Sequence, residues 1–92
     1  MNDDNPVEIP IDGTLDLHTF HPRDVKSLVP HYLELCQEQN ILQVRIIHGK
    51  GTGTLRRTVH SLLEKNKRVA SFRLDDGSGG GWGATLINLH PA

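Results

Sequence analysis

Apolar and polar positions divide the chain into four short strand-like segments and two longer helix-like segments. The short segments are rich in apolar and β-branched residues, as is typical of strands in a small sheet; they are 14–18, 42–47, 68–74 and 84–89. In the longer segments apolar residues recur three and four positions apart, which predicts helices; these are 22–39 and 54–65. The predicted order of elements is therefore β-α-β-α-β-β.

Two prolines, Pro22 and Pro30, indicate the start and the shape of the first predicted helix. Pro22 suits the first turn of a helix, where its missing N–H has no partner to lose. Pro30 removes an internal hydrogen bond, so we expect a bent helix whose bend faces away from the apolar stripe. Asn40 is a candidate C-terminal cap. In the second helical segment, His60 is expected to be a solvated surface residue.

The spacing of the elements predicts the topology of the sheet. A helix that connects two strands makes those strands parallel, so segments 14–18 and 42–47 should pair in parallel. No helix separates the last two strands, so they should form an antiparallel hairpin. The predicted fold is a mixed four-stranded sheet with both helices on one face. Residues 1–12 are polar and acidic and are expected to form a flexible arm before one domain at 13–92.

Composition limits the classes of function. The net charge is −1, so contact with nucleic acid would depend on a local basic patch, which the second half of the chain provides. Aromatic residues make up 4% of the chain, which argues against a base-stacking sheet surface. The single cysteine, Cys36, excludes an internal disulfide and fits a reducing compartment. The sequence has no membrane-length apolar run, and we expect a cytoplasmic protein.

A glycine-rich turn between the second strand and the second helix is the main candidate for chemistry. Glycines and N–H groups at a helix start form a natural anion site, which a lysine and an arginine would strengthen. We expect a phosphate to be held by Gly49, Lys50, Gly51, Thr52, Gly53 and Arg56. Thr52 and Thr54 are also expected to cap the helix. The spacing matches neither a P-loop nor a dinucleotide fingerprint, so a purely structural turn remains an alternative.

Acid–base groups end both parallel strands. Asp16 and His18 are two residues apart at the end of the first strand, and His48 ends the second. Because ligands in such sheets bind beyond the carboxyl ends of the parallel strands, the two motifs should meet there. Imidazoles that titrate near neutral pH are the usual groups for proton transfer.

The motifs Leu15-Asp16-Leu17-His18 and His48-Gly49-Lys50-Gly51-Thr52-Gly53-x-Leu55-Arg56, followed by Gly80-Gly81-Trp82-Gly83-x-Thr85, resemble the Smr (small MutS-related) domain family over about residues 13–90. The resemblance implies a two-layer α/β sandwich like the C-terminal domain of translation initiation factor three. It also implies a nuclease acting on DNA or RNA, including branched or ribosome-associated substrates. Thr19 stands where the family usually has glycine after the first motif.

The resemblance assigns roles to residues of this sequence. The functional positions of the family correspond to Asp16, His18, His48, Gly49 and Gly51. We therefore expect an endonuclease in which Asp16, His18 and His48 are catalytic. The second glycine loop adds Trp82 and Gly83 to the nucleic-acid-binding residues, although Trp82 could equally cap the core.

Several alternatives remain open. No cofactor is expected, but a divalent cation such as magnesium, held by Asp16 and His18, would fit cleavage of DNA by water. A module that binds nucleic acid without cutting it would use the same glycine turn. An enzyme acting on a small phosphorylated molecule fits less well, because short loops offer little depth for a pocket. The oligomeric state stays open, and a monomer is compatible with the sequence.

Overall fold

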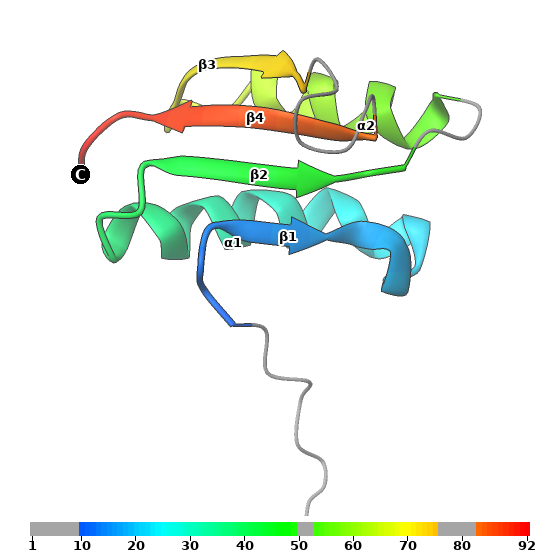
Figure 1. Ribbon diagram of the computed structural model, residues 1–92, viewed down its shortest axis with the longest axis horizontal. Helices are drawn as coiled ribbons and strands as arrows, with labels where there is room; N and C mark the ends of the chain where they lie inside the picture. Colours follow the sequence, from blue (N-terminus) through cyan, green and yellow to red (C-terminus); the bar gives the residue numbers. More distant parts are fainter. Residues whose placement is uncertain (1–9, 50–52, 76–82) are drawn as a thin grey trace, which may run out of the picture.

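The four strands form one mixed sheet in the order β1-β2-β4-β3, as the computed structural model in Figure 1 shows. The structure describes residues 10–49, 53–75 and 83–92. The strands are β1 (Thr14–Asp16), β2 (Gln43–Ile47), β3 (Val69–Leu74) and β4 (Ala84–Leu89). The helices are α1 (Val25–Glu38) and α2 (Thr54–Glu64). The predicted order of elements and the two-layer α/β sandwich are confirmed.

Strand pairing follows the predicted directions. β1 pairs with β2 in parallel, and β4 pairs antiparallel with both β2 and β3. β4 therefore lies inside the sheet, between two strands that precede it in the chain. The bounds of β4 match the prediction, while β2, α2 and β3 differ from it by one residue at one end.

None of the helices in the described part is long and apolar enough to cross a membrane.

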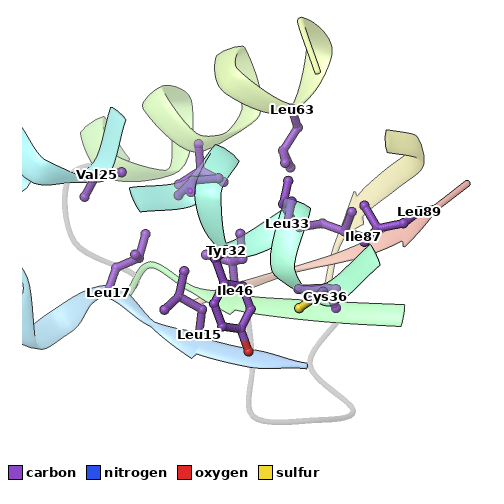
Figure 2. Packing of buried hydrophobic residues seen from close by; sticks show 13 residues of the cluster. Leu15, Leu17, Val25, Tyr32, Leu33, Cys36, Ile46, Leu63, Ile87 and Leu89 are labelled. Atoms are coloured by element: carbon purple, nitrogen blue, oxygen red, sulfur yellow. The ribbon is translucent and has the colours of Figure 1, made fainter. Parts of the chain in front are cut away.

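Both helices pack on one face of the sheet and enclose a single apolar core, drawn in Figure 2. The core is built from the inward positions of β1, β2 and β4 and from the apolar stripes of the two helices. Its buried members are Leu15, Leu17, Val25, Val29, Tyr32, Leu33, Cys36, Val44, Ile46, Val59, Leu63, Ile87 and Leu89. Cys36 is a free, fully buried thiol that packs in this core. Ile11 also packs against this core, so contacts with the fold reach into the segment predicted as an arm.

The first helix begins later than predicted because a 3₁₀ turn (Pro22–Asp24) precedes it. Pro22 occupies the first position of that turn, and the His21 ring accepts a hydrogen bond from the Arg23 N–H. Pro30 lies inside α1 without dividing it. Asn40 follows the helix with a φ of 61°, which confirms its predicted role at the C-terminus.

The predicted first strand is shorter than expected. β1 ends at Asp16, and Leu17–Thr19 form a 3₁₀ turn instead of continuing the strand. The Asp16 carboxylate accepts a hydrogen bond from the His18 N–H at 3.0 Å, an Asx-type contact that bends the chain at this point. The alternating pattern of Leu15 to His18 therefore encodes a strand that ends in a turn.

Candidate active site at the ends of β1 and β2

Asp16 and His18 form an exposed pair where β1 ends. The Asp16 carboxylate lies 3.3 Å from Nδ1 of His18, and the two side chains are 49% and 73% exposed. The same carboxylate oxygen caps the 3₁₀ turn that carries His18. The predicted proximity of the two side chains is thus present, although the turn produces it and not a shared strand face. The arrangement gives an oriented imidazole that is open to solvent.

The turn after β2 is anchored by backbone hydrogen bonds to the start of β4. The N–H groups of His48 and Gly49 both donate to the Gly83 carbonyl, at 2.8 and 2.9 Å. Gly49 has a φ of 85°, a region that other residues rarely adopt. In this structure the Gly49 N–H is therefore engaged within the protein, contrary to the expectation that it donates to a phosphate. Gly83 supplies the carbonyl that holds the turn.

The second helix begins at a glycine. Gly53 is the N-cap residue of α2, with a φ of 87° and no side-chain cap. Thr54 is the first residue of the helix and does not provide the cap predicted for it. A β-carbon on Gly53 would lie 3.1 Å from the Arg56 guanidinium, which folds back over the start of the helix. The positive end of the helix dipole and a guanidinium therefore occupy the same place.

A pocket of about 290 Å³ opens beside these elements. Its lining joins the turn after β2, the first turn of α2 and the 3₁₀ turn before α1: Pro22, His48, Gly49, Gly53, Thr54, Leu55, Arg56 and Thr58. The pocket is thus bounded by predicted site residues from both sides of the glycine-rich turn. Figure 1 shows that β1 and β2 point toward this end of the molecule.

His48 lies beneath the pocket and is largely buried, with 7% of its surface exposed. Its Nδ1 is 3.0 Å from the Gly49 carbonyl, and its Nε2 is 2.8 Å from the Thr85 hydroxyl. Burial lowers the pKa of His48, the Gly49 carbonyl opposes that shift, and the charge of Arg56 lowers the pKa further. His48 is therefore a neutral imidazole with both ring nitrogens engaged inside the protein.

His60 on α2 joins the hydrogen bonds around His48, a role that was not predicted from the sequence. Its Nε2 lies 2.8 Å from the Thr85 hydroxyl, and its ring packs on Phe72 at a centroid distance of 5.0 Å. The prediction of a solvated surface residue is wrong, because the side chain faces β4 and β3. A usable signal was present: His60 precedes the buried Leu63 by three positions, which places it beside the apolar stripe of the helix.

The structure brings the two predicted motifs to one end of the sheet. Asp16 is paired with Ile47, the residue before His48, in the parallel β1–β2 ladder. Asp16 and His18 do not line the pocket, and both side chains are exposed to solvent. Lys50, Gly51, Thr52 and Trp82 lie outside the described residues.

The candidate metal site is limited to the Asp16–His18 pair. Among the residues that the structure describes, no group of three or more His, Cys, Asp or Glu side chains could hold a metal ion. One carboxylate and one imidazole leave most of the ligand positions of a magnesium ion to water or substrate phosphates. The pair on its own therefore provides only part of a coordination shell.

Comparison with known proteins identifies the family. The Smr domain model matches residues 15–90, which include both site motifs and all of the strands and helices except Thr14. The chain is a member of the Smr domain family. Halothermothrix orenii has a protein named Endonuclease MutS2 that is 40% identical over 79 residues, which are 86% of this chain. The Endonuclease MutS2 of Staphylococcus carnosus is 41% identical over 75 residues, 82% of this chain.

Two solved structures share the fold of this Smr domain. The Smr domain of Thermus thermophilus MutS2 superposes with a TM-score of 0.79 at 33% identity, over 85% of this chain and 98% of the other. YdaL, a stand-alone small MutS-related protein from Escherichia coli, gives a TM-score of 0.72 at 22% identity, over 91% of this chain and 69% of the other. The chain spans only about a tenth of the length of the MutS2 proteins that it matches.

Proposed function

We propose that this Smr domain is an endonuclease that cleaves phosphodiester bonds in DNA or RNA. The observation that carries the proposal is the pocket at the start of α2. It combines a helix N-terminus, the Arg56 guanidinium packed against Gly53, and open space beside Gly49 that could receive a phosphate. The relatives named Endonuclease MutS2 support the same class of activity.

The Asp16–His18 pair supplies the proton-transfer group in this proposal. His18 is exposed and held by a carboxylate, as expected of an acid–base group that must reach a substrate. On RNA, His18 would take a proton from the 2′-hydroxyl, whose oxygen then attacks the phosphorus and displaces the 5′-oxygen, which takes a proton from water. On DNA, water would be the nucleophile, and a divalent cation at Asp16 would assist it.

The phosphate pocket supplies charge stabilisation. Negative charge grows on the phosphate oxygens as the attacking oxygen bonds to phosphorus. Arg56 and the N-terminus of α2 are aimed at that position before the reaction begins, so little reorganisation is needed. In this proposal, α2 therefore stabilises the charge of the transition state, and the turn after β1 transfers the proton.

A cleavage assay tests the proposal. Labelled RNA and DNA, single-stranded and branched, are incubated with the protein in the presence and absence of EDTA. His18→Ala is expected to lower the rate by about 10² to 10⁴, the usual contribution of a general acid or base. The matched control is His31→Ala, since His31 is an exposed histidine on α1 outside the pocket lining. If EDTA abolishes cleavage, the reaction needs a divalent cation, and Asp16 would then be assigned as a ligand of that cation.

The second candidate function is a module that binds nucleic acid without cutting it. One observation favours it: both ring nitrogens of His48 are hydrogen-bonded within the protein, which leaves His18 as the exposed imidazole of the two motifs. Folded protein that binds RNA or DNA and cleaves neither would refute the endonuclease and support this module.

A further inference from the structure

A buried hydroxyl connects two histidines from distant parts of the chain. Thr85 on β4 has no exposed surface, and its Oγ1 lies 2.8 Å from Nε2 of His48 and 2.8 Å from Nε2 of His60. The two imidazole rings meet edge to face, with centroids 6.1 Å apart and an interplanar angle of 82°. The hydroxyl therefore lies between the turn after β2 and the middle of α2.

The hydrogen-bond partners determine where the protons are. The Gly49 carbonyl can only accept, so Nδ1 of His48 must carry a proton. A neutral His48 then has a lone pair on Nε2, which must accept the proton of the Thr85 hydroxyl. Having used its proton, the Thr85 oxygen accepts from His60, so Nε2 of His60 carries a proton. With both rings neutral, this is the one arrangement that satisfies all three contacts.

The surroundings favour two neutral rings. Burial lowers the pKa of His60, and the neighbouring His48 and Arg56 lower it further, while Glu64 acts in the opposite direction. Phe72, the group packed on His60 from β3, is uncharged. Arg56 also disfavours a charge on His48. The proton arrangement described above is therefore the expected ground state at neutral pH.

We propose that Thr85 and His60 are positioning residues that hold the His48 ring through a hydrogen bond to its Nε2 and thereby fix the His48–Gly49 turn under the phosphate pocket. The proposal rests on the proposed function and assigns His48 a part in shaping the pocket, with proton transfer left to His18. If Thr85 lost its hydroxyl, Nε2 of His48 would be buried without a donor, and the Gly49 carbonyl would hold the ring from one side only.

Two pairs of variants test this proposal in the full chain. Thr85→Val removes the hydroxyl at nearly constant volume, and Thr85→Ser retains it. His60→Leu removes the donor to Thr85, and His60→Gln retains an amide N–H at a similar position. Imidazole ¹⁵N chemical shifts report both the tautomer of His48 and the hydrogen bond at its Nε2. Cleavage rates and nucleic-acid dissociation constants are measured on the same samples.

The expected results separate positioning from general packing. Wild type should show His48 as Nδ1–H and His60 as Nε2–H, and Thr85→Val should shift the His48 Nε2 resonance to that of a nitrogen without a hydrogen-bond donor. Hydrogen-bonded partners that orient metal-binding histidines are typically worth about 10–100-fold in activity, and we take the same scale for the partners of His48. We therefore expect Thr85→Val and His60→Leu to lower the cleavage rate at least about tenfold, with Thr85→Ser and His60→Gln close to wild type.

Some results would overturn the proposal. A wild-type spectrum with His48 protonated on Nε2 would do so, as would an unchanged His48 Nε2 chemical shift in Thr85→Val. If Thr85→Val fails to fold, the His60→Leu and His60→Gln pair decides the question by the same spectra. If no substrate is cleaved, the endonuclease is refuted. In that case the ¹⁵N chemical shifts of His48, together with the affinity for oligonucleotides, still decide whether Thr85 and His60 position the turn.

Discussion

Nε2 of His60 in the middle of α2 lies 2.8 Å from the hydroxyl of Thr85 on β4, in a contact that spans 25 positions of the sequence. It joins the helix that carries the phosphate pocket to the interior of the sheet. The pKa of His60 is lowered mainly by burial, so the stability of the fold depends on pH.

Stability is expected to fall as the pH drops below that of an ordinary histidine. The folded-state pKa of His60 lies below the unfolded value of about 6.5, so the unfolded chain binds protons first as the pH falls. Stability is therefore full above about pH 6.5 and declines toward pH 5. His60→Gln removes this titration, so its melting temperature should fall less between pH 7.5 and 5.5. His31→Gln controls for loss of an exposed imidazole, and equal slopes in His60→Gln and wild type would contradict the prediction.

Arg56 is expected to contact one phosphate of the bound nucleic acid. Its guanidinium lines the pocket, whereas its neighbour Arg57 is exposed and does not. Loss of one phosphate contact lowers the slope of log K against log salt by about 0.7–0.9. Arg56→Ala should show that decrease and weaker binding in a titration at several salt concentrations. A larger effect of the matched variant Arg57→Ala would place the phosphate elsewhere.

The Tyr32 hydroxyl is expected to stabilise the start of β1. It accepts a hydrogen bond from the buried Gly13 N–H at 3.1 Å and donates to the Thr14 carbonyl at 3.2 Å. Burial raises the pKa of Tyr32 to about 12, so the hydroxyl remains a donor at neutral and moderately alkaline pH. Tyr32→Phe leaves the Gly13 N–H without this acceptor, at a cost of about 1–3 kcal/mol in the free energy of unfolding.

Urea unfolding measures the effect of this substitution. Thr14→Ser is the control, because it changes a side chain at the same place and keeps the carbonyl that Tyr32 bonds. A change of less than about 0.5 kcal/mol in Tyr32→Phe would show that another group takes over the Gly13 N–H.

Asn40 ends α1 in a left-handed conformation that two hydrogen bonds support. The Asn40 N–H donates to the Gln37 carbonyl, and the Ile41 N–H donates to the Cys36 carbonyl at 2.8 Å. This is the pattern of a Schellman motif, in which glycine is the preferred residue. Asn40→Ala should destabilise the fold by about 1 kcal/mol, and Asn40→Gly should be neutral or stabilising. For a domain of this size, 1 kcal/mol shifts the melting temperature by about 4–8 °C.

A melting temperature of Asn40→Ala equal to or above that of Asn40→Gly would contradict this prediction. Both variants remove the same exposed side chain, so the difference between them isolates the cost of the left-handed backbone.

Local patterns predicted the elements well where one residue type decides the geometry. The apolar and β-branched residues of segment 84–89 predicted both ends of β4, and Asn40 was predicted correctly because few residues tolerate a positive φ. The strand pattern of Leu15 to His18 was misleading at its end. The hydrogen bond from the His18 N–H to the Asp16 carboxylate, which no periodicity encodes, ends the strand at Asp16.

The site was predicted in part because its members come from separate segments. The sequence motifs located the Asp16–His18 pair and the glycine-rich turn, and the parallel pairing of β1 and β2 places them at one end of the sheet. The hydrogen bonds of Gly49 to the Gly83 carbonyl and of His48 to the Thr85 hydroxyl depend on the register between β2 and β4. That register is a long-range property, so the role of His60 was missed.

The place of β4 inside the sheet has a consequence for how the molecule acquires its site during folding. β2 and β3 each pair with β4 and not with each other, so the two halves of the sheet join when this strand is inserted. The same strand carries Thr85, and Gly83 directly precedes it. Pairing of β2 with β4 and anchoring of the turn beside the pocket therefore share one non-local step, and a chain that has not inserted β4 lacks the Gly83 carbonyl that holds this turn.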